Sequence, residues 1–140
     1  MTLSRLDGLP SWLLGRSSAS AHRLLTDGFA EAGAHGSHYR LLAALEELGP
    51  SSQADLGREA ELDASDVVAA LEQLEAGALI ARAPDSADKR RRIVSITVAG
   101  KRRLRELDGV VASVQEELLA PLSADERKEL VRLLGRLAGR

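Results

Sequence analysis

Residues 52–80 of this chain, SQADLGREAELDASDVVAALEQLEAGALI, decide the fold. Ser52 can cap a short helix that runs to about Ala60, and Asp63 or Ser65 can cap a second helix that ends near Ala76. The positions at which a helix-turn-helix buries its crossing residues hold small or apolar side chains, namely Leu56, Ala60, Leu62, Val67 and Leu71.

Gly57 supplies the small residue that lets two helices meet at a steep angle. Another kind of short helical hairpin would show the same spacing, so this stretch alone leaves both structures open. The next residues favour the helix-turn-helix. Residues 79–83 and 93–98 predict two strands, and Pro84-Asp85-Ser86 has the chemistry of a turn. A helix-turn-helix followed directly by a two-stranded hairpin is the order of a winged helix.

The predicted hairpin carries positive charge that the net charge of the chain, −2, conceals. From Arg82 to Arg105 there are nine cations and two acids, a net charge of +7, whereas the remainder has ten cations and nineteen acids. Such asymmetry is expected of a protein with a polyanionic partner. The stretch DKRRRIVSIT (88–97) places cations at the tip of the hairpin and Val94 and Ile96 at its base. This arrangement favours contact with nucleic acid over a merely solvated charge run.

Helices are predicted on both sides of this lobe. Residues 10–32 are predicted to form one helix. Ser37 can cap a second helix, and Gly49-Pro50 ends it. Thr97 can cap a long helix with apolar residues at spacings of 3, 4, 3 and 4, namely Leu104, Leu107, Val111, Val114 and Leu118. Ser123 and Glu126 form a capping box that opens a last helix, which carries Leu130, Leu133, Leu134 and Leu137.

These flanking helices either close one intramolecular core or join two protomers. Long helices outside a compact winged helix lack an obvious partner within 140 residues, so self-association is the better account.

The composition excludes several classes of protein. Without cysteine there are no disulfides and no thiolate metal ligands. His35 and His38 lie three residues apart, but the later helices add no histidine, so no metal site is predicted. No nucleophile–base pair, paired-carboxylate motif or glycine-rich phosphate loop is evident, which argues against an enzyme, and no cofactor is predicted. The absence of a targeting segment and of a long apolar run predicts a cytoplasmic protein without membrane contact.

At this point the chain resembles the MarR family of bacterial transcriptional regulators over nearly its whole length. The family's wing pattern stands here as Asp88-Lys89-Arg90, then RRIVSIT, then Gly100, with Ile96 in place of a leucine. The preceding LEQLEAGALIAR (71–82) matches the end of the family's recognition helix and its entry to the wing. The resemblance implies a homodimer that binds palindromic duplex DNA. It also implies that a small ligand often relieves this binding.

The expected DNA contacts divide between the wing and the recognition helix. Arg90 at the tip can enter the minor groove, Asp88 can hold its guanidinium by a bidentate pair, and the neighbouring cations neutralise phosphates. Many relatives carry Arg or Lys on the recognition helix, but residues 65–76 here have none. Base reading would then rest on serine, aspartate, alanine and glutamine. The expected contact residues are Gln53, Ser65, Asp66, Ala69, Gln73, Asp88, Lys89, Arg90 and Arg91.

The predicted fold is mainly α with a small β-wing, a single MarR-type domain over residues 1–140. The winged helix-turn-helix lobe covers residues 36–98, and residues 8–32 and 99–140 form the dimerisation helices. The expected dimerisation residues are Leu104, Leu107, Val111, Val114, Leu118, Leu130, Leu134 and Leu137. The family's ligand cleft lies between these helices and the winged helix, where Trp12 and His22 could line it. The rival interpretation is a winged helix used as a protein-interaction module, whose basic wing docks an acidic partner.

Overall fold

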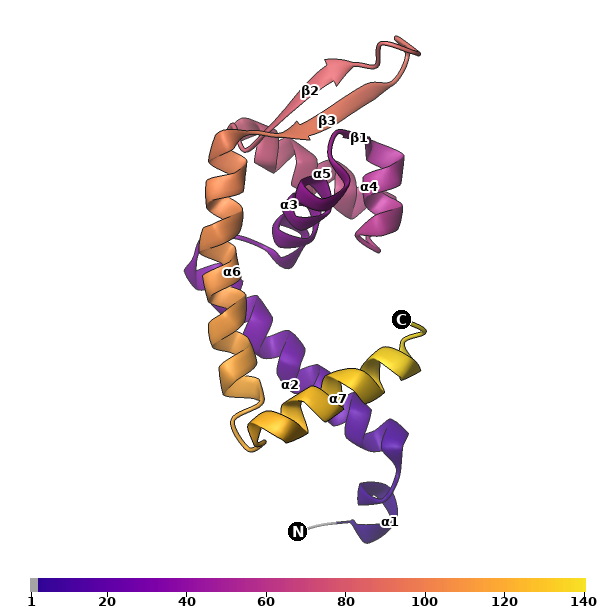
Figure 1. Cartoon of the computed structure of the whole chain (residues 1–140), viewed down its shortest axis with the longest axis vertical. Coiled ribbons are helices and arrows are strands. Elements are labelled where there is room, and N and C mark those ends of the chain that lie inside the picture. Colours follow the sequence, from indigo (N-terminus) through magenta and orange to yellow (C-terminus); the bar gives the residue numbers. More distant parts are fainter. Residues whose placement is uncertain (1–2) are drawn as a thin grey trace. The chain divides into compact units, whose positions relative to one another are not determined.

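The protein is described by a computed structural model that covers residues 3–140 and divides into two compact units (Figure 1). The winged-helix unit spans Thr26–Val110, and the terminal unit comprises the described part of Met1–Leu25 together with Val111–Arg140. The winged-helix unit is longer than the predicted lobe of residues 36–98. Its additional residues include Phe29, Leu104 and Leu107, which are all buried.

Three helices form the body of the winged-helix unit: α3 (Gly36–Leu48), α4 (Gln53–Glu59) and α5 (Ala64–Ala76). Leucines at the helical spacing expected for one face meet between them. The fully buried leucines of these helices are Leu41, Leu42, Leu45, Leu56, Leu71 and Leu74. Because aromatic residues are only 2% of the chain, branched aliphatic side chains provide nearly all of this core.

The helix-turn-helix is confirmed, with α4 and α5 as its two helices. A β-carbon at Gly57 would lie 3.1 Å from Cγ2 of Val67, so this glycine permits the close approach of the two helices. In the turn, Glu61 has a φ of 54°, and the N–H of Leu62 donates to the carbonyl of Gly57 (3.0 Å). Arg40 of α3 donates to the carbonyls of Ala60 (3.4 Å) and Glu61 (3.3 Å), which fixes the turn against α3.

The caps of these helices are partly as predicted. Ser52 accepts the N–H of Asp55 (3.2 Å), and Asp63 rather than Ser65 caps α5. The prediction that Ser37 caps α3 is wrong, because the helix already begins at Gly36 and His35 is its N-cap residue.

The sheet has three antiparallel strands in the order β1 (Ser51–Ser52), β3 (Arg92–Ile96) and β2 (Ile80–Pro84). The hairpin pairs Ile80 with Ile96 and Pro84 with Arg92, which leaves residues 85–91 as the wing tip. Ile80 and Val94 are buried and anchor the strands to the helices. Two strands and their turn were predicted. The short β1 was not, since two serines give no strand pattern.

The long helix α6 (Val98–Leu118) corrects the predicted dimerisation seam. Leu104, Leu107 and Val114 are buried within the single chain, so they have no surface to offer a second protomer. For these three residues the intramolecular alternative holds. The first half of α6 is tied to α3 by the Tyr39 hydroxyl, which donates to Oδ1 of Asp108 (2.8 Å).

The terminal unit contains α1 (Ser4–Asp7), the first part of α2 (Pro10–Glu31), the end of α6 and α7 (Ala124–Leu137). The predicted capping box is present, since Ser123 accepts the N–H of Glu126 (3.2 Å) and Glu126 accepts that of Ser123 (2.8 Å). Arg127 joins α7 to α6 through both carboxylate oxygens of Glu116 (2.9 and 3.0 Å). Among residues 3–140, no helix has the length and apolar character that crossing a membrane requires.

Candidate nucleic-acid interface

The exposed face of α5 is the first part of the candidate interface. Val67, Ala70, Leu71 and Leu74 are buried, so the opposite face of the helix is open to solvent. Positions 65, 69, 72 and 76 follow each other at helical spacing along the middle of that face, and all four residues are exposed. We call Ser65, Ala69, Glu72 and Ala76 the central line of α5. The predicted contact residues Asp66 and Gln73 lie beside this line.

The hydroxyl of Ser65 takes part in the hydrogen bonds that cap α5. Its hydroxyl donates to Oδ1 of Asp63 (2.9 Å), the same oxygen that accepts the N–H of Asp66 (3.0 Å). The two bonds favour the ionised carboxylate, and the pKa of Asp63 is therefore below its ordinary value, with the backbone bond as the largest cause. Ser65 can still accept a hydrogen bond, but its proton is already shared with the cap.

Gln73 has a partner that no sequence pattern indicates. Its Oε1 lies 2.7 Å from Nε2 of His38, which belongs to α3. The N–H of His35 donates to Nδ1 of the same ring (3.4 Å), so Nε2 carries the proton and donates to Gln73. Burial lowers the pKa of His38, which keeps the ring neutral. A bidentate contact of Gln73 with adenine needs Oε1 as an acceptor, so His38 competes with that prediction.

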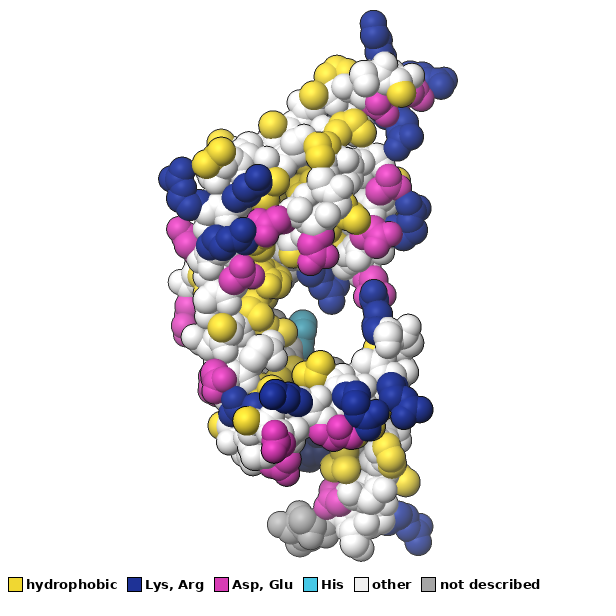
Figure 2. All heavy atoms as spheres, in the orientation of Figure 1, with side chains coloured by type: hydrophobic (Ala, Val, Ile, Leu, Met, Phe, Trp, Pro, Cys, Tyr) yellow, Lys and Arg dark blue, Asp and Glu magenta, His cyan; other side chains and the backbone are white. Residues whose placement is uncertain are grey.

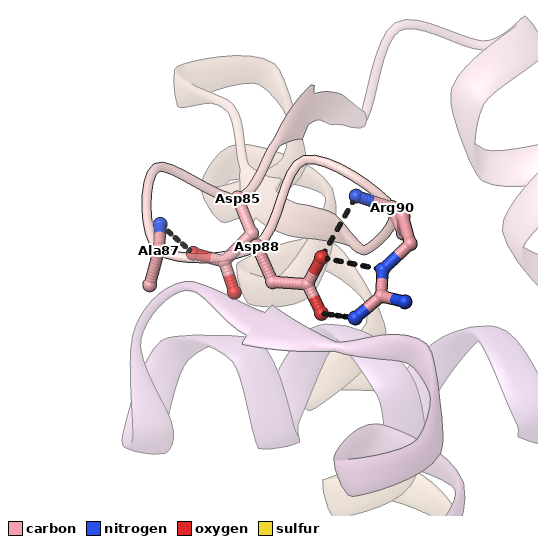
Figure 3. Close-up of polar contacts among 4 residues, drawn as sticks. All are labelled: Asp85, Ala87, Asp88 and Arg90. Atoms are coloured by element: carbon pink, nitrogen blue, oxygen red, sulfur yellow. Dashed lines mark hydrogen bonds and ion pairs between the residues drawn. The ribbon is translucent and has the colours of Figure 1, made fainter.

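The wing tip, residues 85–91, is a folded turn rather than a loose loop (Figure 3). The carboxylate of Asp85 accepts the N–H of Ala87 (2.9 Å), and the Asp85 N–H donates to the carbonyl of Arg91 (2.9 Å). The N–H of Arg91 donates in turn to the carbonyl of Asp88 (2.9 Å). These bonds give the tip a defined backbone without any buried side chain.

Asp88 holds Arg90 as the sequence predicts. Its Oδ1 accepts both the backbone N–H and Nε of Arg90 (3.1 Å each), and its Oδ2 accepts from a terminal guanidinium nitrogen (3.4 Å; Figure 3). The Arg90 side chain is nevertheless 91% exposed, so the guanidinium is oriented but accessible. The bonds from the Arg90 side chain, followed by that from its backbone, lower the pKa of Asp88.

The cations between Arg82 and Arg105 do not form one patch. Arg82 turns back to α5, where its buried Nε lies 3.6 Å from Oε2 of Glu75. Arg103 donates to Glu106 and to the carbonyl of Ala32. Arg105 pairs with Glu46 (2.9 Å).

Most of the cations of this stretch that lack a partner in the described part of the chain lie at the wing, and the others are Lys101 and Arg102 near the start of α6. Within residues 3–140, Lys89, Arg91 and Arg92 make no side-chain hydrogen bond or ion pair, and all three are exposed. Figure 2 shows Lys and Arg side chains gathered at the end of the wing. Gln53, the predicted contact residue that belongs to neither α5 nor the wing, is the half-buried first residue of α4.

The base of the wing is joined to the end of α5 through Thr97, a role that sequence inspection missed beyond its capping of α6. The Thr97 hydroxyl donates to the carbonyl of Ala78 (2.8 Å) and accepts the N–H of Gly100 (3.0 Å). The Thr97 N–H donates to the carbonyl of Leu79 (3.1 Å). The recognition helix, the wing and α6 therefore share one hydrogen-bonded junction.

The predicted ligand residues lie outside the hollow that the winged-helix unit contains. This hollow, of about 330 Å³, is lined by Leu45, Glu46, Gly49, Pro50, Ser95, Ile96, Lys101 and Arg105. Trp12 and His22 are both exposed and lie on α2, in the terminal unit, where a ligand role for them stays a prediction.

Among residues 3–140, no group of three or more His, Asp or Glu side chains is arranged to hold a metal ion.

The comparisons with known proteins point to one family. A model of the MarR family matches residues 32–91. The HTH-type transcriptional repressor NicR of Pseudomonas putida is 32% identical over 96 residues, which are 69% of this chain and 61% of NicR. The match thus spans less than two thirds of NicR.

Two solved structures are similar over almost the whole chain. A probable transcriptional regulator from Pseudomonas aeruginosa is 32% identical with a TM-score of 0.82, covering 94% of this chain and 98% of that one. The PcaV transcriptional regulator from Streptomyces coelicolor, in complex with its natural ligand, is 29% identical with a TM-score of 0.79, covering 99% and 98%.

Proposed function

Because the chain belongs to the MarR family, we propose that it is a transcriptional regulator that binds a specific, palindromic duplex DNA operator as a homodimer. The proposed sign of regulation is repression, which is also what the name of the relative NicR states for that protein. Since the match covers only part of NicR, this function rests on the geometry of the chain itself.

One observation carries the proposal: the wing tip presents an oriented guanidinium. Asp88 fixes Arg90 at the end of a folded turn, while Lys89, Arg91 and Arg92 stand free around it. An arginine held in this way suits the narrow minor groove, where the negative potential is enhanced, and the free cations suit phosphates. In the same compact unit, α5 has an exposed face, and the major groove of duplex DNA admits an α-helix.

A homodimer accounts for the apolar surface of the terminal unit. Several large apolar side chains there are at least 37% exposed in the single chain, namely Leu3, Leu9, Trp12, Leu13, Leu14, Val131, Leu133, Leu134 and Leu137. Large contiguous apolar patches are rare on monomeric proteins, and a second protomer would cover these side chains. Of the predicted dimerisation residues, Val111, Leu118, Leu130, Leu134 and Leu137 keep this role in the proposal.

A small effector belongs to the proposal as well. The PcaV structure was solved with a natural ligand bound to that protein. For this chain we retain Trp12 and His22 as the residues expected near such a molecule. Replacing each by alanine and measuring whether compounds from a small-molecule library that release operator DNA from the wild type still release it from the variant would test their role.

The deciding experiment is selection of bound sequences from a random duplex pool by the purified protein. A palindrome with half-sites about one helical turn apart, roughly 34–36 Å, is expected from two symmetric recognition helices. Arg90→Ala should weaken binding to that sequence by about 1–3 kcal/mol. Replacing a neighbouring cation that neutralises one phosphate should flatten the slope of log affinity against log salt by about 1.

Arg132→Ala on α7 is the matched control, since it removes the same charge outside the winged-helix unit and should leave the affinity unchanged. Binding to duplex DNA with no sequence preference would contradict a specific operator and leave the protein-interaction alternative open. A stable folded species of 14.9 kDa in sedimentation at micromolar concentration would contradict the homodimer.

A further inference from the structure

The recognition helix carries an unpartnered carboxylate where a base-reading side chain is expected. Glu72 lies in the central line of α5, opposite the buried Leu71 and Leu74, and it is exposed. Among residues 3–140 it makes no hydrogen bond or ion pair. The sequence pattern alone assigns base reading to the neighbours of Glu72 and not to Glu72 itself.

Two other carboxylates near this face, those of Glu75 and Asp63, are already engaged. Glu75 lies about one helical turn further along α5, and its Oε2 is 3.6 Å from Nε of Arg82 in β2. Asp63 accepts two hydrogen bonds at the cap of α5. Glu72 is thus the acid of the central line, and the wing and the cap leave it free for an external partner.

The remaining members of the central line cannot reach as far as Glu72. Ala69 and Ala76 have single methyl groups on either side of it, and the proton of Ser65 is shared with Asp63. Small neighbours let a helix approach a groove floor closely, so the one long side chain between them meets the base edges. We propose that Glu72 is a specificity-determining residue that accepts a hydrogen bond from the exocyclic amino group of a cytosine in each half-site. This inference rests on the proposed function.

The chemistry of the major groove selects cytosine for such a side chain. An ionised carboxylate only accepts hydrogen bonds. Cytosine offers its N4 amino group as a donor, whereas guanine offers the acceptors N7 and O6 and thymine the acceptor O4. Adenine offers an N6 donor beside its N7 acceptor, which a carboxylate repels and an amide can satisfy. Guanine is therefore the base that Glu72 excludes most strongly at the position it reads.

The test compares the sequences selected from a random duplex pool by three proteins: wild type, Glu72→Gln and Glu75→Gln. The wild type should enrich cytosine at one position of each half-site, and Glu72→Gln should change that preference to adenine. Replacing that C·G pair by T·A should weaken wild-type binding roughly fivefold to tenfold and leave Glu72→Gln almost unaffected. Glu75→Gln removes the same charge one helical turn away and should keep the wild-type preference.

The alternative role of Glu72 is plain repulsion of phosphates. In that case Glu72→Gln tightens binding to every sequence by the same factor and leaves the selected sequence unchanged, which overturns the inference while the proposed function stands. A wild-type protein that selects no sequence overturns both. Since glutamate and glutamine have similar helix propensity, circular dichroism should give the same folded spectrum and unfolding temperature for Glu72→Gln as for the wild type.

Discussion

The α-carbon of Gly100 lies so close to Leu79 that a β-carbon on it would stand 2.1 Å from the Leu79 carbonyl oxygen. That carbonyl also accepts the N–H of Thr97 at 3.1 Å. Neither the oxygen nor the helix can move without breaking the junction that joins the recognition helix to the wing. The glycine of the wing pattern is therefore required by the packing of backbone on backbone.

Gly100→Ala is expected to destabilise the protein by about 3 kcal/mol or more, at the upper end of what overpacking costs, because a carbonyl oxygen is in the way. Gly109→Ala is the control on the same helix, since nothing lies within 4 Å of its added methyl group. It should stabilise the protein by roughly 0.5–1 kcal/mol through helix propensity. Urea unfolding measures both free energies, and equal effects of the two substitutions would refute the close contact as the cause.

Asp88→Ala is expected to weaken operator binding several-fold, although it removes a negative charge near DNA. The reason is that Asp88 orients Arg90 through both carboxylate oxygens. In an Arg90→Ala background, the same substitution should no longer weaken binding, since nothing remains to be oriented. Fluorescence anisotropy with labelled operator gives the four affinities. Tighter binding by Asp88→Ala at every salt concentration would mean that the tip is only an electrostatic patch.

The cap of the recognition helix should make stability depend on pH in acid. The pKa of Asp63 is lowered in the folded protein, so its contribution is complete above the unfolded value of about 3.9 and is lost as pH falls through the lower folded value. Asp63→Asn keeps a good cap that does not titrate. Its unfolding temperature should fall less between about pH 6 and pH 3 than that of the wild type. Parallel curves for the two proteins would show that Asp63 does not contribute.

The bond between His38 and Gln73 predicts a titration that nuclear magnetic resonance can follow. Burial lowers the pKa of His38, while the bond to Gln73 raises it and the charges of His35 and Arg103 lower it. Gln73→Ala should therefore lower the pKa of His38 further. Because the folded state prefers the neutral ring, this histidine favours folding above the unfolded value of about 6.5 and less so as pH falls. A higher pKa of His38 in Gln73→Ala than in the wild type would contradict the hydrogen bond between His38 and Gln73.

Much of the winged helix could be predicted from local signals. Ser52, Asp63 and Ser123 are capping residues with the right apolar residues behind them, and each caps the expected helix. The Asp88–Arg90 pair was predictable because both residues lie in one turn, where sequence separation fixes distance. The seam of α6 was misleading at Leu104 and Leu107, since a heptad pattern records an apolar stripe and not the chain that covers it.

Contacts between distant segments left no such trace. His38 and Gln73 are 35 positions apart, and Thr97 meets Ala78 across the whole wing. Neither pair has a residue type or spacing that distinguishes it from ordinary polar residues on a protein surface. Glu72 was different, because the helical period already placed it opposite Leu71 and Leu74. The sequence does not show that Arg82 pairs with Glu75, so that Glu72 has no ion-pair partner among residues 3–140.

The position of β3 between β1 and β2 has a consequence for how this regulator can change over generations. The strand is hydrogen-bonded on both sides and Val94 is buried beneath it, while residues 85–91 contribute no buried side chain. If the chain binds DNA as proposed, substitutions of Lys89 or Arg91 are therefore expected to alter the attraction for DNA with almost no effect on folding. On the proposed function, mutation at this tip would tune the occupancy of an operator in small steps, without the loss of stability that constrains change elsewhere in the domain.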